Sequence, residues 1–123
     1  MRIDKFTDQF RRDLAEAQSI AISNSSPYIE PKHLLLAIVD QSDSPNKRIL
    51  LRAGVDVGKL KTRLRNLIVN APKVHDFDGE INISRELSNQ FNLAEREAES
   101  REDKYISGDS YLLVLSKDRG EIG

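Results

Sequence analysis

A helical unit occurs twice in this chain at an offset of 77 residues, and this repeat limits the folds that the chain can adopt. Helix caps, the apolar stripe of the first helix and the entry to the second helix all recur. The matched pairs are Thr7 with Ser84, Phe10 with Leu87, Leu14 with Phe91, Ala17 with Ala94, Ala21 with Ala98, Tyr28-Ile29 with Tyr105-Ile106, and Leu34-Leu35-Leu36 with Tyr111-Leu112-Leu113. Apolar residues spaced three and four apart predict amphipathic helices. We therefore predict an all-α fold in which the duplicated helical repeat packs as a pseudo-twofold bundle around a shared core.

The repeat also predicts how the chain is organised. We expect a single domain over 1–123, made of repeat one (1–72), a linker (73–83) and repeat two (84–123). Repeat one contains two further helices, one after Ser44-Pro45 and one capped by Asp56 and ended by Pro72, that have no counterpart in repeat two. Repeat two is therefore expected to be truncated. We expect the domain boundary roughly two dozen residues further on, and a chain extended to it to be more stable.

The composition argues against several classes of partner. With 19 basic and 20 acidic side chains, the chain lacks the excess of Lys and Arg that general binding to nucleic acid or a membrane surface requires. No apolar run approaches the ~18 residues of a membrane span, and the N-terminus lacks the apolar core of a leader, so we expect a soluble, cytoplasmic protein. The absence of cysteine excludes disulfides, thiolate metal sites and cysteine nucleophiles.

Motifs for catalysis and cofactor binding are absent or weak. The glycines form neither of the common phosphate-binding patterns, so we expect no nucleotide or other cofactor on this chain. His75 to Glu80 alternates oxygen ligands, but counted from Asp76 the sixth and twelfth positions are Ile81 and Leu87, where a calcium loop needs Gly and Glu. This favours a solvated acidic linker over a metal site. His33 and His75 are the only candidate bases for a small hydrolase. His33 falls in the first turn of a buried helix, where packing or hydrogen bonding is favoured.

Two charged clusters are interpreted as solvated surfaces. The basic cluster, Lys59, Lys61, Arg63 and Arg65, alternates with the apolar stripe of its helix. The acidic cluster comprises Glu95, Glu97, Glu99, Glu102 and Asp103. The charge is also uneven along the chain, since 1–72 contains 12 basic and 8 acidic side chains, whereas 73–123 contains 7 and 12.

Three segments carry a resemblance to a known family. They are the opening Met1 to Thr7, then Ala15-Glu16-Ala17-Gln18, and then Ile29 to Ala37. Together with the Ala53-Gly54-Val55 turn and the Tyr105-Ile106-Ser107 entry to the second repeat, they resemble the N-terminal domain of the Clp ATPases, most closely that of the bacterial ClpB disaggregases. The resemblance covers essentially the whole chain, and the ClpA and ClpC domains share its pattern more loosely.

The resemblance implies a mobile substrate-binding module that is not itself an enzyme. Such a domain heads a homohexameric AAA+ unfoldase, captures unfolded or aggregated polypeptide, and passes it to a central pore. ATP and magnesium are bound by other domains of the parent protein, which works with a DnaK-type chaperone system. The alternative is a domain that docks a folded adaptor protein, as in the ClpA and ClpC unfoldases that feed a protease.

The resemblance also implies a substrate-binding groove between the repeats. The family's polar set falls on Thr7, Asp103 and position 109, where Asp109 shortens the Glu that is usual there. Carboxylates and a hydroxyl at these positions suit weak binding of many exposed polypeptide segments.

The apolar contact positions of the family are only partly kept. Phe91 and Leu93 retain apolar character, whereas Glu97 and Ser110 depart from it. Phe91 also falls on the apolar stripe of the repeat, where core packing is the favoured interpretation. Leu93 lies off that stripe and is the clearer candidate for contact with a client.

Overall fold

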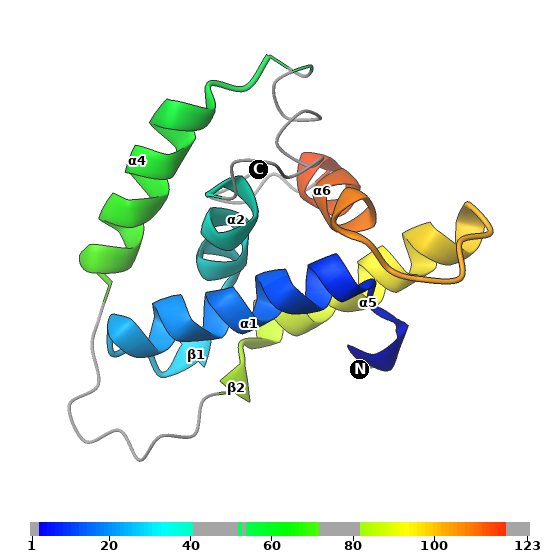
Figure 1. Ribbon diagram of the computed structural model, residues 1–123, viewed down its shortest axis with the longest axis horizontal. Coiled ribbons are helices and arrows are strands. Elements are labelled where there is room, and N and C mark those ends of the chain that lie inside the picture. Colours follow the sequence, from blue (N-terminus) through cyan, green and yellow to red (C-terminus); the bar gives the residue numbers. More distant parts are fainter. Residues whose placement is uncertain (1–2, 41–51, 53, 72–81, 118–123) are drawn as a thin grey trace.

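The computed structural model describes residues 3–40, 52, 54–71 and 82–117, which are mostly helical (Figure 1). In chain order the elements are η1 (Ile3–Lys5), α1 (Asp8–Ser23), β1 (Tyr28–Ile29), α2 (Pro31–Val39), α4 (Val57–Val69), β2 (Asn82–Ile83), α5 (Arg85–Ser100) and α6 (Gly108–Lys117). The predicted all-α class is confirmed. The helix predicted after Ser44-Pro45 and most of the linker lie outside the described residues. No described helix has both the length and the apolar content needed to cross a membrane.

The predicted caps start three of the helices. The Thr7 hydroxyl accepts a hydrogen bond from the Phe10 amide at 3.1 Å, which begins α1. Ser84, its repeat partner, accepts from the Leu87 amide at the same distance and begins α5. Asp56 does the same for α4. Each side chain satisfies an amide that the first helical turn leaves without a backbone partner.

The two long helices also end in the same way. Ser25 after α1 and Glu102 after α5 have φ values of 55° and 60°, in the left-handed region. The next residue of each turn then donates back into the helix, from Ser26 to the Ala21 carbonyl and from Asp103 to the Ala98 carbonyl, both at 2.9 Å. This is a Schellman turn, here built without glycine. The repeat therefore extends to backbone conformation and not only to side-chain pattern.

The two repeats interlock through exchanged backbone pairing. β1 pairs in parallel with β2, with Ile29 opposite Ile83, and Phe6 forms a parallel bridge with Ile106. The two pairings are equivalent, because Phe6 and Ile83 are 77 residues apart, as are Ile29 and Ile106. In each, the segment ahead of one repeat's first helix pairs with the segment ahead of the other repeat's second helix. This exchange gives the pseudo-twofold arrangement that the repeat predicts.

The core lies between the repeats, as predicted. Four buried rings meet there, from Phe6 and Phe10 of repeat one and Phe91 and Tyr111 of repeat two. The centroid distances range from 4.7 Å for Phe6–Phe10 to 5.9 Å for Phe91–Tyr111, within the range of favourable ring contacts. The Tyr111 hydroxyl donates to the Gln90 side chain at 2.7 Å, so this buried donor is satisfied.

The second helices of the two repeats differ in how they are covered. In α2 every residue except Lys32 is buried, because α1 packs on one side and α4 on another. Among the described elements, the main neighbour of the equivalent helix α6 is α5. Leu113 of α6 is 37% exposed, whereas its repeat partner Leu36 is buried.

Candidate functional site

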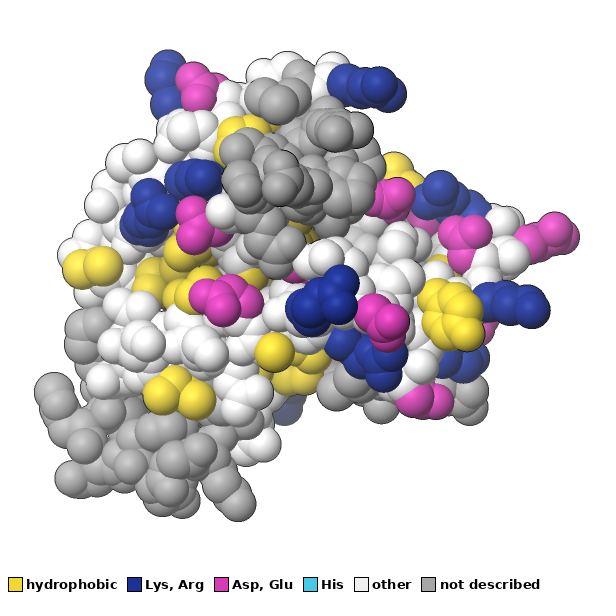
Figure 2. Space-filling view, viewed as in Figure 1, with side chains coloured by type: hydrophobic (Ala, Val, Ile, Leu, Met, Phe, Trp, Pro, Cys, Tyr) yellow, Lys and Arg dark blue, Asp and Glu magenta, His cyan; other side chains and the backbone are white. Residues whose placement is uncertain are grey.

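The exchanged pairing brings Thr7 close to the segment that contains Asp103 and Asp109, the other two residues of the predicted polar set. Thr7 donates its backbone N–H to the Ile106 carbonyl at 2.9 Å, which holds the start of α1 against the segment between Asp103 and Asp109. Thr7 belongs to repeat one, and Asp103 and Asp109 belong to repeat two, at least 96 positions later in the sequence. The pairing therefore brings residues of both repeats to one region. In the view of Figure 2, acidic, basic and apolar side chains are interspersed over the end of α5 and the turn that follows it, on the right.

Each member of this set has a distinct local role. Thr7 accepts from the Phe10 amide and is half-buried, and its hydroxyl hydrogen is left to donate. Asp103 lies in the turn after α5, where its carboxylate is exposed and lies 3.9 Å from the Arg101 guanidinium. Asp109 lies in the first turn of α6, where the helix dipole favours a negative charge. Together they present one hydroxyl and two acceptor carboxylates.

The two predicted apolar contacts are separated by the fold. Phe91 is 1% exposed and belongs to the ring cluster of the core. Its prediction as a client contact is therefore wrong for this structure, because the other three rings cover it, whereas the core packing favoured by its spacing is confirmed. Leu93 is 48% exposed, as expected from its place off the stripe.

Leu93 lies in a shallow groove that runs along α5 beside α6. The groove has a volume of about 580 Å³, and its other lining residues are Glu86, Asn89, Gln90, Arg96, Glu97, Ser100 and Val114. None of Thr7, Asp103 and Asp109 lines it. The structure thus places Leu93 in a groove that is separate from the predicted polar set. Ser110, the other departure from the apolar pattern, is fully buried and offers no surface.

His33 is a structural residue of α2. It is 1% exposed, and its Nδ1 accepts from the Glu30 amide at 2.9 Å, which caps the helix. Burial is the main cause that lowers its pKa to about 4, with Lys32 acting in the same direction and Glu30 opposing them. The ring is therefore neutral at pH 7, with Nδ1 as an acceptor, as its predicted packing and hydrogen bonding require.

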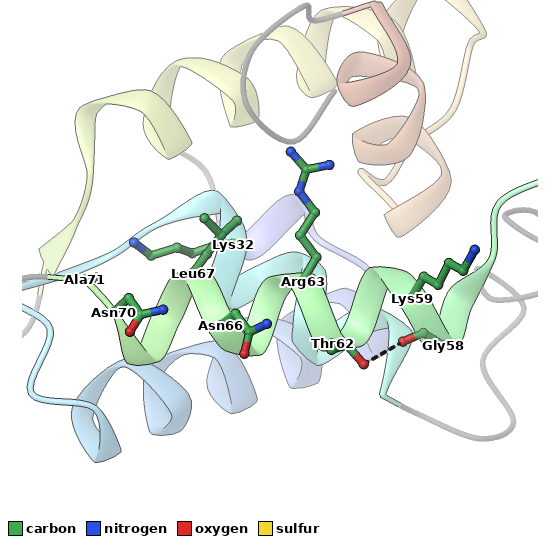
Figure 3. A pocket seen from close by; sticks show the side chains of 9 residues that line it. All are labelled: Lys32, Gly58, Lys59, Thr62, Arg63, Asn66, Leu67, Asn70 and Ala71. Atoms are coloured by element: carbon green, nitrogen blue, oxygen red, sulfur yellow. Dashed lines mark hydrogen bonds between the residues drawn. The ribbon is translucent and has the colours of Figure 1, made fainter.

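A second groove, along α4, was not predicted from the sequence. Figure 3 shows its lining side chains, which come from one face of α4 and from Lys32 of α2. From the sequence, the basic cluster of this helix is interpreted as a solvated surface, without a groove. The sequence signal for a groove is the apolar residue Leu67, which follows Lys59 and Arg63 at successive four-residue steps. In the structure its side chain is half-buried.

Metal ligands do not gather in the described part of the chain. No three His, Asp or Glu side chains among those residues are placed to hold a metal ion. The acidic stretch from His75 to Glu80 lies outside the described residues.

Comparison with known families decides the identity of the domain. Residues 5–123 match the family described as the Clp repeat (R) N-terminal domain. The chain belongs to this family. Its predicted relationship to the N-terminal domains of the Clp ATPases is therefore confirmed, and this family is the non-catalytic N-terminal module of AAA+ ATPases.

Relatives of known type support the same placement. The chain is 39% identical to the chaperone protein ClpB of Vibrio cholerae over 123 residues, which is all of this chain and 14% of that protein. It is 30% identical to ClpB of Bacillus cereus, over 99% of this chain and 14% of that protein. The chain thus spans about one-seventh of the length of these relatives.

Solved structures share the fold. The N-terminal domain of Hsp104 from Candida albicans superposes with a TM-score of 0.82 at 23% identity, over 94% of this chain and 75% of that one. The N-domain of ClpV from Vibrio cholerae gives 0.82 at 20% identity, over 94% and 68%. A complex of the ClpV N-domain with a VipB peptide gives 0.79 at 18% identity, over 98% and 75%. The predicted Clp N-domain-like architecture is confirmed.

Proposed function

We propose that this domain is the substrate-capturing N-terminal module of a ClpB-type, ATP-dependent protein disaggregase. The observation that supports the proposal is the backbone bond of Thr7 to Ile106, which brings the start of α1 to the 103–109 segment, in a chain that aligns with ClpB over its whole length. In this role the domain is not an enzyme. The parent protein is a cytoplasmic homohexamer that binds ATP and magnesium in other domains and works with a DnaK-type chaperone system.

The chemistry of the polar set suits weak capture of unfolded polypeptide. Unfolded clients carry backbone N–H groups without partners, and two carboxylates with a hydroxyl accept or share such hydrogen bonds. Exposed interactions of this kind contribute about 1 kcal/mol each, which keeps binding weak. Weak binding permits transfer to the next domain. Leu93 offers a separate apolar contact in its own groove on α5.

Client binding by domain variants tests the proposal. We expect Asp103→Asn and Asp109→Asn to weaken binding of a labelled, permanently unfolded protein by about threefold to tenfold each, measured by fluorescence anisotropy. Thr7→Ala should weaken it as well. Ser84→Ala is the matched control, because it removes the equivalent helix cap outside the polar set. Unchanged binding in both Asp variants would refute this site.

Docking of a folded adaptor is the second candidate. The solved complex of a ClpV N-domain with a VipB peptide is relevant to it, because a domain of this fold there binds a segment of one defined protein. Affinity capture on the immobilised domain from a lysate separates the two functions. One stoichiometric folded partner favours adaptor docking, whereas many misfolded proteins that are released by an unfolded competitor favour client capture.

A further inference from the structure

The groove along α4 has the size of a binding site and an unusual lining. We call it the basic groove, with a volume of about 690 Å³; its lining residues are Lys32, Gly58, Lys59, Thr62, Arg63, Asn66, Leu67, Asn70 and Ala71. Three of these side chains are cationic, and none is a carboxylate. In Figure 3 the lining side chains of α4 follow the length of that helix, and Lys32 extends from the start of α2.

The cations of α4 divide into two rows. Lys61 and Arg65 both reach Asp40, at 3.4 Å and 3.1 Å, so their charge is partly neutralised. Lys59 and Arg63, on the basic groove, form no ion pair with any described residue. Among the described residues, the unpaired positive charge of α4 therefore lies mainly along the groove.

The basic groove also contains apolar and amide side chains beside its cations. Leu67 and Ala71 are half-buried, whereas the core face of α4 is formed by other residues, including Leu64 and Ile68. Leu67 thus faces the groove as a partly wet apolar surface. The exposed amides of Asn66 and Asn70 lie on the same flank and can both donate and accept hydrogen bonds.

The repeat shows that this charge is specific to one half of the domain. Lys32, at the start of α2, is the repeat partner of Asp109, at the start of α6. The same structural position is thus basic at the start of α2, beside the basic groove, and acidic at the start of α6. Lys32 also approaches Glu30, at 2.8 Å, so it carries less free charge than Lys59 and Arg63.

We infer that the basic groove is a docking site for acidic segments of polypeptide, separate from the polar set of Thr7, Asp103 and Asp109. Lys59, Arg63 and Leu67 follow at four-residue steps, which places them about 6 Å apart along the helix axis. In an extended peptide, side chains on one side recur every about 6–7 Å. An extended segment with carboxylates at alternate positions and an apolar residue two further on therefore matches this row. The amides of Asn66 and Asn70 bind its backbone.

A polypeptide fits better than a nucleic acid. Three cations on a domain of net charge −1 do not provide the extended positive surface that phosphate-backbone binding uses. The basic groove also has an apolar element, Leu67, and its lining by described residues includes no aromatic ring on which a base would stack.

Peptide binding to the whole chain tests the inference. The probe is a fluorescein-labelled Ser-Glu-Ser-Glu-Ser-Leu-Ser peptide, measured by anisotropy, with a matched peptide that has Gln in place of both Glu. We expect a dissociation constant on the order of 100 μM at about 50 mM salt, and binding at least about fivefold weaker at about 300 mM salt. The Gln peptide should bind at least about fivefold more weakly than the Glu peptide.

Two double variants of α4 locate the site. Lys59→Gln with Arg63→Gln should weaken binding of the Glu peptide at least about tenfold, whereas Lys61→Gln with Arg65→Gln should change it less than about threefold. Both remove two positive charges from the same helix, and unchanged circular dichroism shows that both remain folded. Equal weakening in the two variants would overturn the inference, because it would indicate general electrostatic attraction. Tighter binding of a single-stranded oligonucleotide, lost in the same variant, would overturn the assignment to a polypeptide.

The outcome is independent of the client-binding proposal. Asp103→Asn should leave binding of the Glu peptide unchanged within about twofold, since the polar set does not line the basic groove. If the acidic peptide does not bind while the unfolded protein does, the basic groove has a different role and the polar set is unaffected.

Discussion

At the scale of single residues, His33 makes stability depend on pH. Its pKa is lowered from 6.5 to about 4 in the folded domain. Between these values the unfolded chain binds a proton that the folded chain does not, so stability falls as the pH is lowered from about 6.5 to 4 and this contribution then levels off. The loss is at most about 3 kcal/mol.

Urea unfolding of wild type and His33→Asn between pH 7.5 and 4 tests this dependence. The free energy of unfolding should decrease less in the variant, whose side-chain oxygen replaces Nδ1 as the acceptor that caps the helix. His75→Asn is the control, and an identical slope in His33→Asn would contradict the assignment.

A second prediction at this scale separates the two apolar positions on α5. Phe91→Ala should reduce the free energy of unfolding by about 3–5 kcal/mol, because the ring is enclosed by three others in the core. Leu93→Ala should change it by less than about 1 kcal/mol, since that side chain is half exposed. Denaturant titration measures both. Similar losses in the two variants would mean that Leu93 is packed more closely than its exposure indicates.

At the scale of elements, the turns that end α1 and α5 carry a conformational strain that glycine would relieve. Ser25 and Glu102 have positive φ values, which cost about 1 kcal/mol for residues with a Cβ. Ser25→Gly and Glu102→Gly should therefore each stabilise the domain by about 0.5–1 kcal/mol, measured as a raised thermal midpoint. Ser23→Gly is the control, because Ser23 is within α1 and glycine there should destabilise. A lowered midpoint for both turn variants would refute the strain.

The elements also show which features can be predicted from sequence. The caps at Thr7, Asp56 and Ser84 and the buried stripes were predictable because they depend on residues a few positions apart. The division of the α4 cations was not, since it depends on Asp40, which is 21 and 25 positions from Lys61 and Arg65. Likewise, the meeting of Thr7 with the 103–109 segment depends on a single backbone bridge that no local pattern indicates.

At the scale of the whole molecule, the exchanged pairing makes the two repeats one cooperative unit. The Thr7 and Ser84 amides each donate across the repeat boundary at 2.9 Å, to Ile106 and Ile29. Each bond therefore joins segments that belong to different repeats. We expect both amides to exchange with solvent only through global unfolding, with equal free energies of opening, as measured by native-state hydrogen exchange. A much lower value for either amide would mean that the repeats separate before they unfold.

The long separation between bridge partners also sets an order of events during synthesis. Phe6 pairs with Ile106, a residue made 100 positions later. At about 5–20 residues per second, the N-terminal segment waits about 5–20 s for its partner to be made. Phe91, which packs against the Phe6 ring, is made only near the end of that interval, and Tyr111, which completes the ring cluster, is made after it. The newly made first repeat is thus itself an unfinished chain, with an apolar surface that stays uncovered until the second repeat is made.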